Sequence, residues 1–251
     1  DEMLSHVKDS KSSDSMNTRV DEIKHWWGLT LDFLEKNSTS LGAAVTKILT
    51  ESEKPDVFPA GMDANWALDA QSAQTLDFLA ALQSKTGKKA WDLGTLTGVS
   101  AAVLSQHMDV VTVEREPKLV AFAKQHLPAN VEVINSEILP FLEQRASSGQ
   151  KADLIFMDLD KTCYLPCYDA IMKFKLLAPG GILICDNVLY RGLVAQHEAG
   201  EMPAVTEKTA ANAAALSGFV SRVRQDTDAG TVRSLMMPVR DGILAISTPV
   251  V

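Results

Sequence analysis

The stretch Trp91-Asp92-Leu93-Gly94-Thr95-Leu96-Thr97-Gly98-Val99-Ser100 decides the fold, because it leaves an apolar strand and enters a helix through two glycines. Glycine lets a backbone approach a ligand closely, and the first turn of a helix offers free N–H donors. Glu114 closes the next apolar run, and an acid at this place can accept both hydroxyls of a ribose. The stretch therefore predicts that an adenosine-containing ligand lies across the ends of two strands.

The same turn also bears on the kind of ligand. Dinucleotide-binding turns favour G-x-G-x-x-G, in which the second glycine clears room for a pyrophosphate. Leu96 stands at that position, so a diphosphate would fit badly. S-adenosylmethionine (SAM) has no phosphate, and Asp92 could accept its ammonium group. In the simplest alternative, the glycines serve only the turn and Glu114 is solvated.

Strand and helix patterns alternate along the chain around this turn. Apolar runs predict strands at residues 90–93, 110–114, 131–135, 154–157 and 182–185, with helices at 99–106, 117–125, 138–144 and 164–177. Strict alternation implies a parallel sheet covered by helices on both faces. A helix at 209–224 precedes β-runs at 232–239 and 243–247, and Asp241-Gly242 between these runs predicts an antiparallel hairpin. The predicted fold class is α/β with a Rossmann-like, mostly parallel sheet.

The N-terminal part of the chain has a different pattern. Residues 1–17 are polar without apolar periodicity, which is typical of a flexible arm. Helices are predicted at 20–34, 41–49 and 66–82, and Trp26, Trp27 and Trp66 on them are either core residues or part of a pocket wall. We therefore divide the chain into the arm, a helical extension at 18–60, and the α/β domain at 61–251.

Composition excludes some classes of partner. The 251 residues include 24 Lys+Arg against 32 Asp+Glu, a net charge of -8, so nucleic acid is not expected as a partner. No run approaches the roughly 18 apolar residues of a membrane span. Cys163, Cys167 and Cys185 lack further ligands for zinc and suit free thiols in a reducing compartment. We expect a cytoplasmic protein, and the start at Asp1 is compatible with a removed presequence.

Oxygen ligands follow two of the predicted strands. Asp158, Asp160 and Lys161 come directly after the fourth strand, and Asp186 and Asn187 after the fifth. Neighbouring strands lie about 4.8 Å apart, so side chains at adjacent strand ends can converge on one cation. Two carboxylates and an amide oxygen favour Mg²⁺, with Ca²⁺ or Mn²⁺ as alternatives. In a doubly wound sheet this cation and the adenosine ligand would share the crevice beside the first strand.

Lys161 follows these predicted ligands and has two interpretations. A hydroxyl bound to a divalent cation loses its proton more easily, and Lys161 could take this proton while the oxygen attacks a methyl carbon. Asp160 and Lys161 could instead cap a helix, and Asp186-Asn187 could form a simple turn. Each simpler interpretation is reasonable alone, but all of them would have to be true at once, together with a glycine turn that binds no ligand. We therefore favour the catalytic interpretation.

At this point the chain resembles a known family. The motifs Asp92–Ser100, Asp158-Leu159-Asp160-Lys161 and Asp186–Gly192 are similar to those of the cation-dependent O-methyltransferases, which include the caffeoyl-coenzyme A and catechol enzymes. The resemblance extends over residues 68–246, and Pro238–Gly242 matches the final hairpin of that family. It implies SAM as methyl donor, a seven-stranded sheet with a reversed last strand, a homodimer, and a methyltransferase domain at 61–251.

The resemblance also implies roles for individual residues. Asp158, Asp186 and Asn187 would hold the metal, Lys161 and Asp158 would be catalytic, and Arg191 would contact the acceptor. The implied contacts of SAM are Asp92, Gly94, Thr95, Ser100, Glu114, Ser136, Glu137, Ile138, Asp158 and Asp160. Family substrates are mostly vicinal diols, so the expected acceptor is the hydroxyl of a small catechol-like molecule.

Two other functions compete with O-methyl transfer. An NAD-dependent oxidoreductase would use Glu114 but leave the oxygen ligands without a role. An inactive SAM-binding protein would not need an intact Lys161. A coenzyme A thioester suits the acidic net charge less well than a catechol, although Arg19, Lys24 and His25 could supply local positive charge. Residues 194–205 are expected to form either a lid or an ordinary surface loop.

Overall fold

The computed structural model describes residues 13–249. Internal contacts divide the chain into two units, Asp1–Ser40 and Leu41–Val251, and each is described here by itself. The described part of the first unit contains helix α2 (Ser13–Lys36). Residues 1–12 of the predicted arm lie outside the described residues, and the predicted domain boundary at residue 60 stays a prediction. Within the described part of the chain, no helix is long and apolar enough to cross a membrane.

The second unit is built on a seven-stranded sheet with the order β3-β2-β1-β4-β5-β7-β6. Its strands are β1 (Lys89–Leu93), β2 (Asp109–Glu114), β3 (Val131–Asn135), β4 (Ala152–Met157), β5 (Leu177–Cys185), β6 (Arg233–Met237) and β7 (Ile243–Ser247). Strands β1 to β5 pair in parallel, whereas β7 runs antiparallel to both β5 and β6. The Rossmann-like class and the reversed last strand are confirmed.

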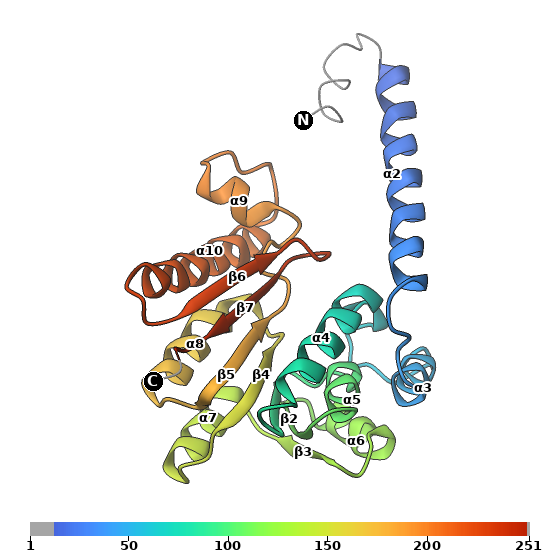
Figure 1. The fold of residues 1–251 in the computed structure, drawn as a ribbon. Coiled ribbons are helices and arrows are strands. Elements are labelled where there is room, and N and C mark those ends of the chain that lie inside the picture. Colours follow the sequence, from blue (N-terminus) through green and yellow to red (C-terminus); the bar gives the residue numbers. More distant parts are fainter. Residues whose placement is uncertain (1–12, 250–251) are drawn as a thin grey trace. The chain divides into compact units, whose positions relative to one another are not determined.

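Helices cover both faces of this sheet (Figure 1). One core cluster joins the sheet to α7 (Ile138–Ser147), α8 (Tyr164–Lys173) and α10 (Glu207–Asp228). The opposite cluster joins it to α3 (Ala43–Ser52), α4 (Ala70–Gln83) and α5 (Val99–Ser105), and α6 (Pro117–His126) contributes Phe122 to its edge. The shorter elements are η1 (Ala64–Trp66), η2 (Lys161–Cys163) and α9 (Leu193–Glu198). Burial on both faces explains why the central strands are apolar runs without alternation.

Three details of the sequence prediction are corrected. The helix predicted at 164–177 ends at Lys173, and the strand predicted at 182–185 begins at Leu177. Lys175 has a left-handed φ of 52°, which ends the helix so that the buried Leu177 can join the sheet. Within the predicted loop 194–205, the helix α9 reaches to Glu198.

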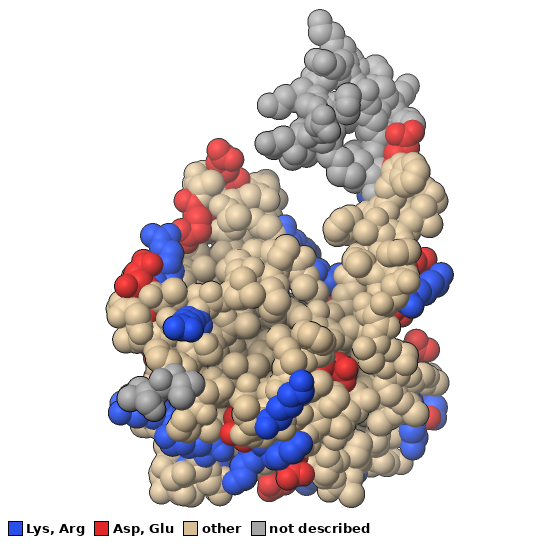
Figure 2. Space-filling view, viewed as in Figure 1, with Lys and Arg blue, Asp and Glu red and all other residues tan. Residues whose placement is uncertain are grey.

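The aromatic and sulfur side chains also differ in their placement. Trp26 and Trp27 are 62% and 60% exposed, so neither is a core residue. The three cysteines are free thiols, as predicted, with Cys167 and Cys185 buried. On the face shown in Figure 2, charged side chains of both signs are interspersed around a broad uncharged area.

Candidate active site

The predicted residues gather at the carboxyl edge of the sheet. Strand β4 lies between β1 and β5, so the segments that follow these three strands are neighbours. A crevice opens there between the β1 turn, the end of β4 and the segment before α4. It is lined by Trp66, Ala67, Leu68, Gly94, Thr95, Leu96, Thr97, Val99, Ser100, Phe156 and Asp158. Trp66 therefore belongs to a pocket wall, which is one of the two locations that the sequence analysis allowed for it.

Gly94 allows the β1 turn to pass close to the end of β4. Its φ is 103°, and a Cβ at this position would lie 2.1 Å from the carbonyl oxygen of Asp158. No residue with a side chain fits there without a shift of the backbone. Two residues later Leu96 also has a left-handed φ of 48°, and its N–H donates to the Glu114 carboxylate at 3.0 Å. The turn is thus held between the ends of β2 and β4.

Asp92 is a buried acid inside this turn. The Thr112 hydroxyl donates to its Oδ2 at 2.6 Å, and its Oδ1 has no hydrogen-bond partner among the described residues. Burial raises the pKa of Asp92 from 3.8 to about 7. The Thr97 hydroxyl is likewise buried without a partner in the described part of the chain. Buried polar atoms without partners are rare in proteins and indicate a place for a polar ligand group.

The other predicted contacts of the cofactor lie around the same turn. Thr95 and Ser100 are buried, and the Thr95 hydroxyl lies 2.5 Å from that of Thr112. Ser136 follows β3, and its N–H donates to the Glu114 carbonyl at 3.1 Å. Glu137 is the N-cap of α7, which begins at Ile138. The SAM contacts predicted after β3 are therefore next to Glu114, the predicted ribose acid.

Asp160 lies at the surface of this edge. Its side chain is 56% exposed and forms an ion pair with Arg115, whose Nη2 lies 2.7 Å from Oδ2. Arg115 follows β2, whereas Asp160 follows β4 on the other side of β1. The pair therefore bridges the two segments that flank the glycine turn.

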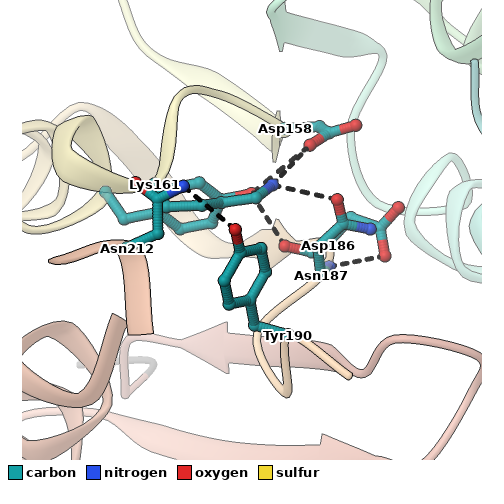
Figure 3. A network of polar contacts seen from close by, with 7 residues as sticks. Asp158, Lys161, Asp186, Asn187, Tyr190 and Asn212 are labelled. Carbon is teal, nitrogen blue, oxygen red and sulfur yellow. Dashed lines mark hydrogen bonds and ion pairs between the residues drawn. The ribbon is translucent and has the colours of Figure 1, made fainter. Parts of the chain in front are cut away.

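Two of the three predicted metal ligands, Asp158 and Asn187, meet at Lys161 (Figure 3). The ammonium group of Lys161 donates to Asn187 Oδ1 at 2.9 Å and to Asp158 Oδ1 at 3.3 Å. Asn187 follows β5 and has a left-handed φ of 58°, which asparagine tolerates better than most residues. Asp158 and Asn187 therefore converge, as predicted from adjacent strand ends, and the Asp186 carboxylate lies next to them, where it accepts the Asn187 N–H at 2.7 Å.

The charge of this cluster suits a cation. Asp186 is buried, and burial followed by repulsion from Asp158 raises its pKa from 3.8 to about 7. Lys161 pairs with Asp158, so the cluster has a net negative charge whenever Asp186 is ionised. Among the described residues no three His, Cys, Asp or Glu side chains form a metal site. The proposed set consequently depends on the amide oxygen of Asn187, which with two carboxylates fits Mg²⁺.

Three residues of this site were missed by sequence reasoning. The buried Tyr164 donates its hydroxyl hydrogen to the Asp186 carbonyl at 2.7 Å and lies 3.3 Å from the Lys161 nitrogen. The Asn212 amide donates to the Tyr190 hydroxyl at 3.1 Å. Tyr190 points toward Lys161 and Asn187 (Figure 3). Tyr164 lies three residues after Lys161, and this spacing could have indicated its place in the site. No sequence pattern indicates that Asn212 on α10 reaches Tyr190.

The loop after β5 is held in an uncommon backbone conformation. Tyr190 and Arg191 have φ angles of 46° and 57°. The Arg191 guanidinium lies 5.9 Å from the centre of the Tyr190 ring, and its backbone N–H donates to the Asp241 carboxylate. Successive left-handed residues without glycine are costly and are found mainly at functional sites. The predicted acceptor residue Arg191 therefore lies beside the metal ligands on this loop.

Comparison with known proteins finds similar sequences with one kind of chemistry. The sequence profile of a family described as O-methyltransferase matches residues 57–248. A probable caffeoyl-CoA O-methyltransferase of Dictyostelium discoideum is 27% identical over 188 residues, which cover 70% of this chain and 76% of the relative. A catechol O-methyltransferase domain-containing protein of Mus musculus is 32% identical over 140 residues, 51% of this chain and 52% of the relative.

Solved structures share the fold. The SAH-bound methyltransferase of Podospora anserina superposes with a TM-score of 0.71 at 22% identity and covers 95% of this chain and 97% of its own. An O-methyltransferase from Bacillus cereus in complex with SAH gives a TM-score of 0.70 at 19% identity, with coverage of 86% and 96%. At these identities the likeness concerns the arrangement of the sheet and helices.

Proposed function

Because this chain belongs to the O-methyltransferase family, we propose that it transfers a methyl group from SAM to a hydroxyl of a small catechol-like acceptor, with the help of a divalent cation. One observation carries the proposal. Asp92 on β1 and Asp186 after β5 are both buried, and both have pKa values raised to about 7. Two buried acids at one edge of the sheet match the two positively charged groups expected there, the ammonium group of SAM and the divalent cation.

The residues of the crevice divide between the two ligands. On the cofactor side, Asp92 would bind the ammonium group and Glu114 the ribose, and the Gly94 turn would lie against the methionine part. On the acceptor side, Asp158, Asp186 and Asn187 would hold the cation, which when bound would orient a diol and make its hydroxyl more acidic. Lys161, whose nitrogen lies within 3.3 Å of two of these ligands, would accept the hydroxyl proton in its neutral amine form. Orientation of both substrates would supply much of the rate enhancement.

The test is transfer of labelled methyl from SAM to a panel of catechols and other diols, in Mg²⁺ and in a chelator. We expect transfer to catechols that is lost in the chelator and restored when Mg²⁺ is added back. Transfer undiminished by the chelator would refute the metal assignment. SAM binding without transfer to any acceptor would instead favour an inactive SAM-binding protein. The other alternative, an NAD-dependent oxidoreductase, is disfavoured because the chain belongs to the O-methyltransferase family.

The pH dependence of SAM binding tests the role of Asp92. The free carboxyl, with a pKa of about 7, takes up a proton as the pH falls below 7, whereas an ammonium group binds only the carboxylate. The Kd of SAM should therefore rise below pH 7, by up to about tenfold per pH unit, and binding should release a proton. Calorimetry in buffers of different ionisation enthalpy measures both quantities.

Two variants control this pH experiment. Asp92→Asn should bind SAM weakly and without this pH dependence. Asp109→Asn, at the exposed start of β2, should behave like the unchanged protein. A Kd that is constant from about pH 5.5 to 8 would show that Asp92 does not bind the ammonium group.

We also propose that the enzyme is a homodimer, as the family resemblance implies. Strand β6 is an edge strand of the sheet, and its Leu235 is 61% exposed. An apolar sheet edge is prone to pair with another chain. Sedimentation equilibrium should give twice the mass of one chain, and Leu235→Lys should lower that mass. A monomer at concentrations where the enzyme is active would contradict the proposal.

A further inference from the structure

Arg240 lies at the carboxyl edge of the sheet without a role in the site described so far. Strand β7 runs antiparallel to β5 with Leu244 opposite Cys185, so the turn before β7 reaches the same edge as Asp186 and Asn187. Two backbone hydrogen bonds fix this turn to the loop after β5: Val188 N–H to Gly242 O at 3.1 Å, and Leu189 N–H to Asp241 O at 2.8 Å. The order β1-β4-β5-β7 places the metal ligands between the cofactor turn and Arg240.

The backbone at Arg240 is strained. Its φ is 48°, in the left-handed region that residues other than glycine, asparagine and aspartate seldom adopt. Nothing in the packing of the hairpin requires a long side chain here, since the Arg240 side chain is 46% exposed. A strained position with a charged side chain beside a reaction centre is a candidate for a ligand contact.

The guanidinium of Arg240 lies beside Asp69, which is next in sequence to a residue that lines the crevice. Its Nε lies 3.5 Å from Asp69 Oδ1, and Leu68, the preceding residue, lines the crevice with Asp158. The carboxylate of Asp69 is already occupied as the N-cap of α4, because it accepts the Gln71 and Ser72 N–H groups at 3.0 and 3.1 Å. Among the described residues the guanidinium has no other ion-pair or hydrogen-bond partner, so its terminal amino groups remain available.

We propose that Arg240 binds an anionic substituent of the acceptor, so that the preferred substrate is a catechol that carries a carboxylate. The inference rests on the proposed function and names the substrate class of that same site. The planar fork of an arginine matches a carboxylate with two parallel hydrogen bonds. A single guanidinium beside Asp69 suits one monovalent anion, whereas the several phosphates of a coenzyme A thioester would need more positive charge. The diol would bind toward the metal ligands and the carboxylate toward the hairpin.

The test compares two acceptors that differ only in charge, 3,4-dihydroxybenzoate and its methyl ester. We expect the unchanged enzyme, with SAM and Mg²⁺, to prefer the acid by about tenfold in kcat/KM. Arg240→Gln should reduce this preference to about one by slowing the acid alone and leaving the ester unchanged. Arg240→Gly removes the charge and also relieves the strain at φ 48°, so the same loss in both variants assigns the effect to the charge.

Controls and a binding measurement separate this inference from the proposed function. Arg233→Gln, at the far end of the same hairpin on β6, should keep the preference for the acid. Equal use of both acceptors by the unchanged enzyme, or an unchanged preference in Arg240→Gln, overturns the inference. If neither acceptor is methylated, calorimetry of 3,4-dihydroxybenzoate with the SAH-loaded protein decides the inference separately from the proposed function. The inference is upheld if Arg240→Gln binds 3,4-dihydroxybenzoate about tenfold more weakly than the unchanged protein. It is overturned if the two proteins bind it equally.

Discussion

Replacing Asp186 by asparagine is expected to lower Mg²⁺-dependent methyl transfer by about a thousandfold and to stabilise the metal-free protein. Both effects follow from the same carboxyl. Burial and repulsion from Asp158 raise its pKa to about 7, so the carboxylate is unfavourable in the fold unless a cation is bound. Asparagine keeps an oxygen that can accept the Asn187 N–H, which donates to Asp186 Oδ1 at 2.7 Å. It loses the charge that would hold the metal.

The sign of the stability effect depends on pH. The folded carboxyl has a pKa of about 7 and an ordinary value of 3.8, so its ionisation opposes folding above pH 7. As the pH falls from 7 to 3.8, the folded carboxyl is protonated while the unfolded one is still ionised, so this cost shrinks steadily, and it is gone below 3.8. The metal-free Asp186→Asn variant should therefore gain on the order of 2 kcal/mol above pH 7 and little near pH 4.

Three measurements test this prediction together. Denaturant unfolding at two pH values gives the stability of the metal-free protein, calorimetry gives the Kd of Mg²⁺, and labelled methyl gives the rate. Asp169→Asn, an exposed carboxylate on α8 that pairs with Arg222, is the matched control and should change none of the three strongly. Retention of metal-dependent activity by Asp186→Asn would remove Asp186 from the ligand set.

The sequence could predict the features that depend on neighbouring residues. The Gly94 turn, the alternation of strands and helices, and the Asp241-Gly242 hairpin each follow from local patterns, and all three are present. The placement of Asp158 and Asn187 within reach of the same lysine could also be predicted. Parallel strands end at one edge of the sheet, and β4 lies between β1 and β5. Local pattern and topology together thus located the candidate site.

The remaining features depend on packing between distant parts of the chain. The contact of Asn212 with Tyr190 requires α10 to lie against the loop after β5. The contact of Arg240 with Asp69 joins the last hairpin to the start of α4, which no local periodicity reveals. Even the start of β5 was misplaced, because the sequence Pro179-Gly180-Gly181 is typical of a helix stop but here lies inside a strand. The acceptor end of the candidate site is built from such contacts, which local sequence patterns do not reveal.

Lys161→Ala is expected to lower kcat by a factor of about 100 to 10,000 if Lys161 accepts the hydroxyl proton. The side chain is 13% exposed, and its nitrogen lies near Asp158, Asn187 and the Tyr164 hydroxyl. No other lysine of the described chain contacts these groups. The KM for SAM should change little, since Asp92 and Glu114 would bind the cofactor on the other side of the crevice.

The alternative role of Lys161 is to supply positive charge, and Lys161→Arg separates the two roles. Arginine keeps the charge but cannot give up its proton in a protein, so a base at this position predicts a loss as deep as in the alanine variant. Added primary amines should restore part of the activity of Lys161→Ala and should do nothing for Lys161→Arg, where the side chain fills the space. Lys173→Ala, at the end of α8, should behave like the unchanged enzyme. Near-normal activity in Lys161→Arg would assign Lys161 to charge stabilisation, and the proton would then have to leave by way of water.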